Sequence, residues 1–245
     1  MPEVDTGAPV VDLTAGAGAV WAVTSDAGLL RIDPGTARLT APNPGPVSAI
    51  AAGAGGVWAV CCQGRGPRGR ATRLDPASGR VIASVGLPTR PLAVGTGPGA
   101  VWVRGAEGWL WRVDPAGDRQ AGAIRLPAVP GGAELAGKLV VAGGMLWVTD
   151  PGPGVVRRVD LRSGTEDRWK ADGRHLAVTP GGTVWATSDT RLLGLGGPQV
   201  RGPRRNLHEL ETDRITAVAA AHDGGLWLGT AQGLFHVDRS VLRQG

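Results

Sequence analysis

Four side chains in the sequence belong to the types that carry acid–base chemistry and fall near predicted loops. They are His175, His208, Glu107 and Asp26. A histidine side chain titrates near neutral pH, so either histidine could exchange a proton with a substrate while a carboxylate acts as its partner. This set would suit a lyase, cyclase or hydrolase that needs no cofactor.

A second group of side chains could contact a ligand. Its members are Trp109, Trp169, Arg90, Arg104, Arg174, Arg191, Asp150 and Asp189. An indole face can stack on a cation or an apolar ligand, and an arginine fork suits carboxylates and phosphates. Arg104 or Arg191 could also stabilise negative charge that develops during a reaction. The most polar stretches near these residues are 169–175 and 201–214.

The sequence offers no recognised arrangement for metal, nucleotide or triad chemistry. The two cysteines are adjacent, Cys61 and Cys62, a spacing that rarely forms a disulfide and matches no metal motif. We find no defensible Ser–His–Asp set and no phosphate-binding glycine motif. We therefore expect neither a metal nor a cofactor.

The composition is that of a globular chain with frequent turns. The 245 residues are 42% hydrophobic and include 41 Gly, 19 Pro and nine Trp. The net charge is +5, but the basic residues are spread along the chain, and only Lys138 and Lys170 among the 26 are lysines. This spread does not favour a nucleic-acid partner. No apolar run is long enough to cross a membrane, so we expect a soluble, cytoplasmic monomer whose partner is a small molecule or peptide.

Short strands must position these side chains, and a tryptophan repeat marks the strands. The stretch 18–23 reads Gly-Ala-Val-Trp-Ala-Val, and similar stretches recur along the chain. Their tryptophans are 37, 44, 45, 38 and 42 residues apart, at Trp21, Trp58, Trp102, Trp147, Trp185 and Trp227. A period of about forty residues, with Gly/Pro turns between short apolar runs, is typical of four-stranded repeat units.

We predict an all-β fold, a six-bladed β-propeller of four-stranded antiparallel blades that forms a single domain over residues 1–245. The predicted blades span 10–42, 47–89, 91–127, 134–170, 175–207 and 215–245. Residues 240–244 are predicted as the outer strand of the last blade. Residues 1–9 precede the first strand, and they either pair with the last blade or fray.

The repeated residues themselves are predicted to build the scaffold. One large apolar ring per unit, placed inside a strand, favours core packing over ligand binding. A recurring aspartate at the end of the third strand is predicted to cap a turn by accepting backbone N–H bonds. This set contains Asp33, Asp75, Asp114, Asp160 and Asp238. The inner strands are small and apolar, which does not suit a central cage for a hard cation.

The repeat unit, with its Gly-x-Val-Trp core and its Leu-x-Arg-Val-Asp-Pro-x-x-Gly turn, resembles a group of bacterial propellers. This group contains the streptogramin (virginiamycin B) lyases, NHL-repeat proteins and YVTN-type propellers, and residues 225–235 are similar to the repeat of two-component-regulator propellers. For a lyase the resemblance implies magnesium held by a late His and a Glu-x-His pair. Here His222 is followed by His236-Val237-Asp238, and six units replace seven blades, so the resemblance implies the fold and not that activity.

Three functions fit this pattern. The one we favour is binding of a small molecule or peptide on the loop face near the channel mouth, because Trp109 lies outside the tryptophan repeat and a polar cluster surrounds His175. The second is a cofactor-independent lyase, cyclase or hydrolase that acts on a natural product by His/carboxylate acid–base chemistry. The third is a protein-interaction scaffold or sensor domain. The sequence does not decide whether the protein is an enzyme.

Overall fold

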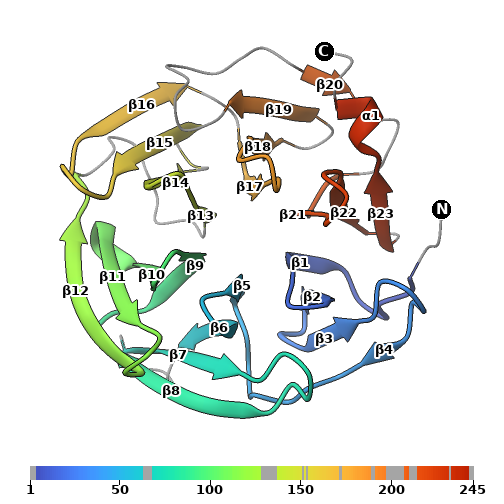
Figure 1. Cartoon of the computed structure of the whole chain (residues 1–245), viewed down its shortest axis with the longest axis horizontal. Coiled ribbons are helices and arrows are strands. Elements are labelled where there is room, and N and C mark those ends of the chain that lie inside the picture. The colour runs from blue at the N-terminus through green and yellow to red at the C-terminus, as the bar shows by residue number, and fades with distance from the viewer. Residues whose placement is uncertain are drawn as a thin grey trace.

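The strands form six antiparallel sheets that radiate from a central channel, as Figure 1 shows. The structure is a computed structural model that describes residues 4–62, 68–127, 137–150, 152, 154–170, 173–188, 191–196, 207–209, 214–231 and 233–242. Each sheet is one blade, and its strands follow one another from the channel outward in chain order. The predicted fold class, an all-β six-bladed propeller, is confirmed.

The first five blades have four strands each within the described residues. Blade one contains β1 (Val10–Gly16), β2 (Ala19–Thr24), β3 (Leu29–Ile32) and β4 (Leu39–Thr40). Blade two contains β5 (Ala49–Gly53), β6 (Gly56–Cys62), β7 (Gly69–Leu74) and β8 (Val81–Leu87). Blade three contains β9 (Pro91–Gly97), β10 (Ala100–Gly105), β11 (Trp109–Asp114) and β12 (Arg119–Arg125), with the short 3-10 helix η1 (Ala106–Gly108) before β11.

The remaining blades follow the same order around the ring. Blade four contains β13 (Leu139–Ala142), β14 (Met145–Asp150), β15 (Val155–Asp160) and β16 (Glu166–Lys170). Blade five contains β17 (His175–Val178), β18 (Val184–Thr187), β19 (Arg191–Gly196) and β20 (Leu207–Glu209). Blade six contains β21 (Ala217–Ala220), β22 (Leu226–Thr230) and β23 (Gly233–Val237), followed by the helix α1 (Arg239–Leu242).

The core lies between neighbouring blades, so the second strand of a blade is buried on both faces. All six residues of β2 are buried, whereas the outer strand β12 has no buried residue. The repeat tryptophans occupy these second strands. Trp21 and Trp58 are fully buried, and Trp102, Trp147 and Trp185 are at most 7% exposed. The prediction of core packing is confirmed for these five, and the sixth, Trp227, is half-buried against the cluster between blades six and one.

The repeated arginine and aspartate have structural roles in the third strand. In four blades the arginine is the cross-strand partner of the repeat tryptophan, and the guanidinium of Arg31 lies 5.9 Å from the ring centre of Trp21. This is the geometry of a cation–π contact. Asp33 accepts the amides of Gly35 and Thr36 at 3.0 and 2.9 Å, and Asp160 accepts those of Arg162 and Ser163. The predicted turn role of the aspartate is therefore confirmed.

The end of the chain differs from the prediction. The outer strand predicted at 240–244 is wrong, because residues 239–242 form the helix α1. The carboxylate of Asp238 accepts the amide of Ser240 at 2.7 Å, so Asp238 caps the helix as an N-cap residue does. Leu242 is buried, and it packs with Trp185 in the core between blades five and six.

The ring closes by packing of the first blade on the last. β1 and β21 lie side by side in Figure 1, and Val10 packs with Ala217 and Leu234 in one buried cluster. Within residues 4–9 the structure places no strand, so the predicted pairing with the last blade is not seen there. Val4 instead contributes its buried side chain to the same cluster.

Candidate functional site

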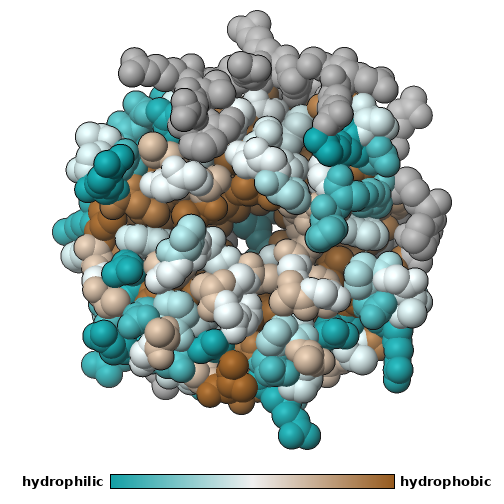
Figure 2. Space-filling view, viewed as in Figure 1, coloured by the Kyte–Doolittle hydropathy of each residue, from teal (hydrophilic) through white to brown (hydrophobic). Residues whose placement is uncertain are grey.

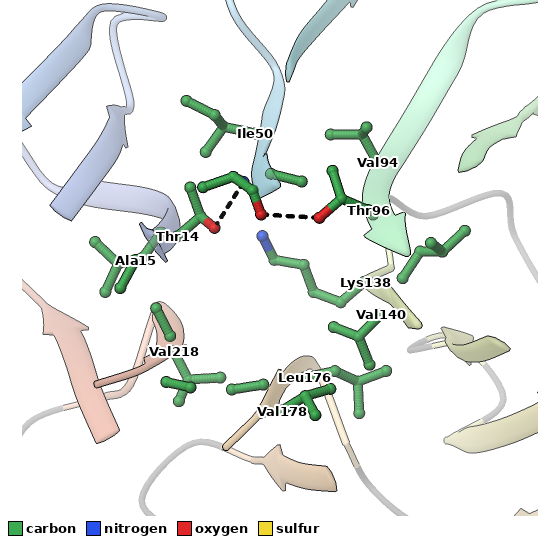
Figure 3. A pocket seen from close by; sticks show the side chains of 18 of the residues that line it. Thr14, Ala15, Ile50, Val94, Thr96, Lys138, Val140, Leu176, Val178 and Val218 are labelled. Carbon is green, nitrogen blue, oxygen red and sulfur yellow. Dashed lines mark hydrogen bonds between the residues drawn. The ribbon is translucent and has the colours of Figure 1, made fainter. Parts of the chain in front are cut away.

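The six inner strands surround a cavity of about 230 Å³ at the axis of the ring. Figure 2 shows the opening of this channel at the centre of the molecule. Its walls are mainly aliphatic, and Figure 3 shows Ile50, Val94, Leu176, Val178 and Val218 around it. Binding sites for small molecules have this character, since apolar walls exclude water and a few polar groups fix orientation.

The strand register shows which residues share one level of the channel. In each blade one residue of the inner strand lies opposite the repeat tryptophan, for example Thr14 opposite Trp21. Two positions earlier, the six inner strands present Asp12, Ala49, Ala93, Lys138, His175 and Ala217. Three of these positions are alanine, so the three polar residues at this level stand out from the repeat.

Asp12 and Lys138 form an ion pair although they come from opposite blades of the ring. The Nζ atom of Lys138 contacts Oδ1 of Asp12, and the two side chains are 13% and 3% exposed. The carboxylate also accepts the amides of Leu13 at 2.6 Å and Ile50 at 2.8 Å, so blade two helps to hold it. Figure 3 shows the Lys138 side chain extending across the cavity toward the Thr14 and Thr96 side.

The backbone around Lys138 is fixed by the neighbouring strand β14. The amide of Lys138 donates to the hydroxyl of Thr149 at 2.7 Å, and its carbonyl accepts the amide of Thr149 at 3.0 Å. Gly137 precedes it, and a Cβ atom at this position would overlap the carbonyl oxygen of Thr149. Glycine therefore lets the chain approach β14 closely and direct the next side chain across the channel.

Burial lowers the pKa of Lys138 to about 7. The carboxylate of Asp12 acts in the opposite direction, because an adjacent negative charge favours the ammonium form. The lysine therefore exchanges its proton much closer to neutral pH than an exposed lysine, whose pKa is about 10.4.

His175 opens β17 at the same level of the channel. Its Nδ1 atom is buried and has no hydrogen-bond partner among the residues that the structure describes. Burial lowers the pKa of His175 to about 3, and the positive charges of Lys138, Arg174 and Arg214 act in the same direction. The imidazole is therefore neutral at physiological pH, and it offers a hydrogen-bonding ring rather than a charge.

Arg104 and Asp150, both predicted as ligand contacts, pair with each other. Arg104 at the end of β10 contacts Oδ1 of Asp150 at the end of β14 and donates to the carbonyl of Thr149 at 2.7 Å. Arg157 approaches Oδ2 of Asp150 at 3.4 Å and also pairs with Glu166 at 2.7 Å. Arg104, Asp150 and Arg157 are all below 9% exposed, so this network ties blade three to blade four.

Trp109 and Trp169, which lie outside the tryptophan repeat, each stack on another tryptophan of the same blade. Trp109 stacks on Trp111 with a ring separation of 5.0 Å, and Arg125 lies 5.4 Å from its centre. Trp169 stacks in the same way on Trp147 at 5.8 Å. The structure gives both rings packing partners, and a ligand contact for either one stays a prediction.

Asp26 lies on the turn between β2 and β3, and Glu107 lies between β10 and β11; neither is among the residues that line the channel cavity. The carboxylate of Asp26 accepts the hydroxyl of Thr24 at 2.5 Å, and this bond holds the pKa of Asp26 below its ordinary value. Asp26 lines a separate surface pocket of about 690 Å³ between the turn of blade one and the segment that leads to blade two. Glu107 sits in η1 with a φ of 60° and is exposed.

The other predicted residues fall in different surroundings. Arg174 is half-buried beside His175, and its carbonyl accepts the hydroxyl of Thr149 at 3.2 Å. Arg90 is exposed just before the inner strand β9, and Arg191 is exposed at the start of the third strand β19. Asp189 lies outside the described residues, and for His208 only the backbone in β20 is described. Of the predicted set, His175 shares the strand level of Asp12 and Lys138, and Arg174 precedes it in the chain. The residues that line the channel cavity on this blade are Leu176, Ala177 and Val178.

Sequence reasoning missed Asp12 and Lys138. Asp12 interrupts an apolar strand, Val-Val-Asp-Leu-Thr, at a position where the second blade has alanine. Lys138 is one of two lysines in a chain that otherwise uses arginine. Alignment of the inner strands on the repeat tryptophans would have exposed both as departures from the repeat.

No metal cluster is found in the part of the chain that the structure describes, since no group of three or more His, Cys, Asp or Glu side chains there could hold an ion. Among the same described residues, no helix has the length and apolar character needed to span a membrane.

Comparison with known proteins identifies solved structures of the same fold. A streptogramin B lyase structure matches with a TM-score of 0.67 at 14% identity, over 97% of this chain and 86% of that chain. A protein of unknown function from Bacteroides thetaiotaomicron matches with a TM-score of 0.69 at 13% identity, over 93% and 68%. The WD40 β-propeller domain of Doa1 matches with a TM-score of 0.61 at 10% identity, over 97% and 96%.

At these identities the matches establish the propeller fold alone. They include the lyase that the repeat unit resembles, so the resemblance is confirmed at the level of fold. The scan against family models and the search of curated proteins found no match.

Proposed function

We propose that this protein binds a small polar molecule at the mouth of its central channel, with Asp12, Lys138 and His175 as the polar contacts. The observation that carries the proposal is the ring of six register-equivalent positions, of which three are alanine and three are these residues. Two of the three, Asp12 and Lys138, contact each other across the channel, and Lys138 also lines its cavity.

The chemistry of the three side chains favours a ligand with both donor and acceptor groups. The pair of Lys138 and Asp12 presents an ammonium and a carboxylate, which a polar ligand can bridge or separate. The neutral ring of His175 adds a buried nitrogen that has no partner within the described part of the chain, and such a group gains free energy when a ligand supplies one. The cavity of about 230 Å³ restricts the ligand to a small molecule.

An acid–base reaction at this face is the second candidate, and the fold shared with streptogramin B lyase is consistent with it. A pKa of about 3 makes His175 a weak base and leaves almost no protonated ring to act as an acid at neutral pH. We therefore assign His175 to binding and look to Lys138 for any reactivity.

Thermal unfolding with a panel of small compounds tests the proposal. We would screen acetate, pyruvate, propanal and inorganic phosphate against the wild-type chain, K138M and K170M. A compound present at ten times its Kd should stabilise the folded state by about 1.4 kcal/mol, which raises Tm by roughly 3–6 °C for a chain of this size.

The two lysines provide a matched pair of variants. Lys170 is exposed at the end of β16, so K170M should respond to the compound as the wild type does. K138M should lose the response. Equal stabilisation of K138M and the wild type by every active compound would place the binding elsewhere and contradict the proposal.

A further inference from the structure

We propose that Lys138 is a nucleophilic amine that forms a reversible imine with a small aldehyde or ketone in the channel, with Asp12 as its proton acceptor and counterion. This inference rests on the proposed function, because the carbonyl compound must first enter the channel mouth. It adds a covalent step and a substrate class that simple binding does not require.

The geometry brings the amine to the cavity. Lys138 lines the channel together with residues of all six inner strands, and its side chain extends into the open space in Figure 3. It keeps 13% of its surface exposed, whereas the carboxylate of Asp12 behind it is 3% exposed. A carbonyl carbon in the cavity can therefore approach the nitrogen from the side that Asp12 leaves open.

The surroundings of Lys138 favour the reactive form of the amine. Burial lowers its pKa to about 7, so Lys138 gives up its proton near physiological pH more readily than an exposed lysine does. The groups that face this site are Asp12 of blade one, His175 and Arg174 of blade five and Arg214 ahead of blade six. Asp12 favours the ammonium form of Lys138, while His175 is neutral because burial and the neighbouring positive charges lower its pKa. Desolvation of a lysine in an apolar pocket is a known way to activate an amine nucleophile.

The reaction balances with the groups present. The ammonium of Lys138 gives a proton to the carboxylate of Asp12, and the neutral amine attacks the carbonyl carbon to form a new C–N bond. A proton moves from nitrogen to the former carbonyl oxygen, which gives a carbinolamine. Asp12 then returns its proton to that hydroxyl group, the C–O bond breaks, and water leaves. The product is a protonated imine beside the Asp12 carboxylate.

The structure holds Asp12 in a state that suits this cycle. Two backbone amides, those of Leu13 and Ile50, donate to the carboxylate at 2.6 and 2.8 Å and keep it aimed at the lysine. The charge on the product nitrogen replaces the charge on the original ammonium, so the ion pair that is neutralised during the reaction is restored in the product. The aliphatic walls limit access of the water that would hydrolyse the imine.

Reductive trapping tests the inference in the wild-type protein, so no variant has to fold. The probes are propanal and pyruvate with sodium cyanoborohydride near neutral pH, followed by proteolysis and mass spectrometry of the two lysine peptides. We expect Lys138 to be alkylated at least about tenfold faster than Lys170, a ratio that corresponds to about 1.4 kcal/mol. A Lys138 rate equal to or lower than that of Lys170 for both probes would overturn the inference.

Calorimetric titration of the same probes without reductant separates this inference from the proposed function. If binding is lost in K138M but trapping shows no preference for Lys138, the channel site is supported and the imine inference is refuted. If neither probe binds and the two lysines are labelled equally, the imine inference is refuted as well. The proposed channel site is then tested by the binding of acetate and phosphate. K170M should keep the wild-type rate at Lys138.

Discussion

Replacing Asp12 with asparagine should destabilise the protein, because it removes one charge of a buried pair and keeps the shape of the side chain. Asp12 accepts two backbone amides and contacts Lys138, and the two side chains are 3% and 13% exposed. Removal of one partner from a buried ion pair costs about 3–5 kcal/mol. For a chain of this size, that cost corresponds to a fall in Tm of roughly 6–20 °C.

The double variant D12N/K138M measures the pair itself. K138M alone leaves the Asp12 carboxylate buried with backbone amides as its remaining partners, so it should cost a similar amount. When both charges are removed, neither partner is left uncompensated. We expect the double variant to be about as stable as either single variant, which gives a coupling energy of about 3–5 kcal/mol.

Urea unfolding followed by tryptophan fluorescence provides the four free energies, since the repeat tryptophans are buried in the folded state. K170M serves as the surface control and should change stability by less than about 0.5 kcal/mol. If the effects of D12N and K138M add to within about 0.5 kcal/mol, the two side chains act independently, and the ion pair across the channel is refuted.

Two further predictions concern the residues on either side of this pair. The pKa of His175 is about 3 in the folded state and 6.5 for the ordinary side chain. Between pH 6.5 and 3 the unfolded chain therefore binds a proton that the folded chain does not, so the free energy of unfolding falls as the pH is lowered through this window. The variant H175N should remove up to about 1.4 kcal/mol per pH unit of this fall. Urea unfolding at several pH values in the window measures it, and an unchanged dependence of stability on pH would count against a buried neutral ring. The variant G137A should lose about 1–3 kcal/mol of stability because the added Cβ would overlap Thr149. G86A is the control, since a Cβ there would meet none of the described atoms within 4 Å. Equal losses of stability in thermal unfolding would show that the close approach at Gly137 does not matter.

The scaffold follows from local sequence patterns, and these were sufficient to predict it. A tryptophan inside a short apolar run, followed by an aspartate turn, is contained in one repeat unit, and repetition fixes the number of blades. The helix α1 was missed because Asp238 belongs to the repeat, and its second role as a helix cap depends on the four residues that follow. Burial of Leu242 against blade five, a contact outside the repeat pattern, helps to hold the helix in place.

The site could be predicted only in part, because its contacts join distant parts of the chain. His175 and Arg174 were found from their polarity next to an inner strand. Asp12 and Lys138 meet only because the ring closes, which sets blades one and four on opposite sides of a narrow channel. Arg104 and Asp150 carry the charges of a binding site, but strand ends in adjacent blades place them against each other.

A lysine-selective NMR spectrum tests the central claim most directly. The chain contains two lysines, so labelling their ε-methylene groups produces one signal from Lys138 and one from Lys170. Titration with a compound that stabilises the protein should move the Lys138 signal to saturation and leave that of Lys170 in place. If the Lys138 signal does not move when such a compound is bound, the ligand does not bind at the channel mouth.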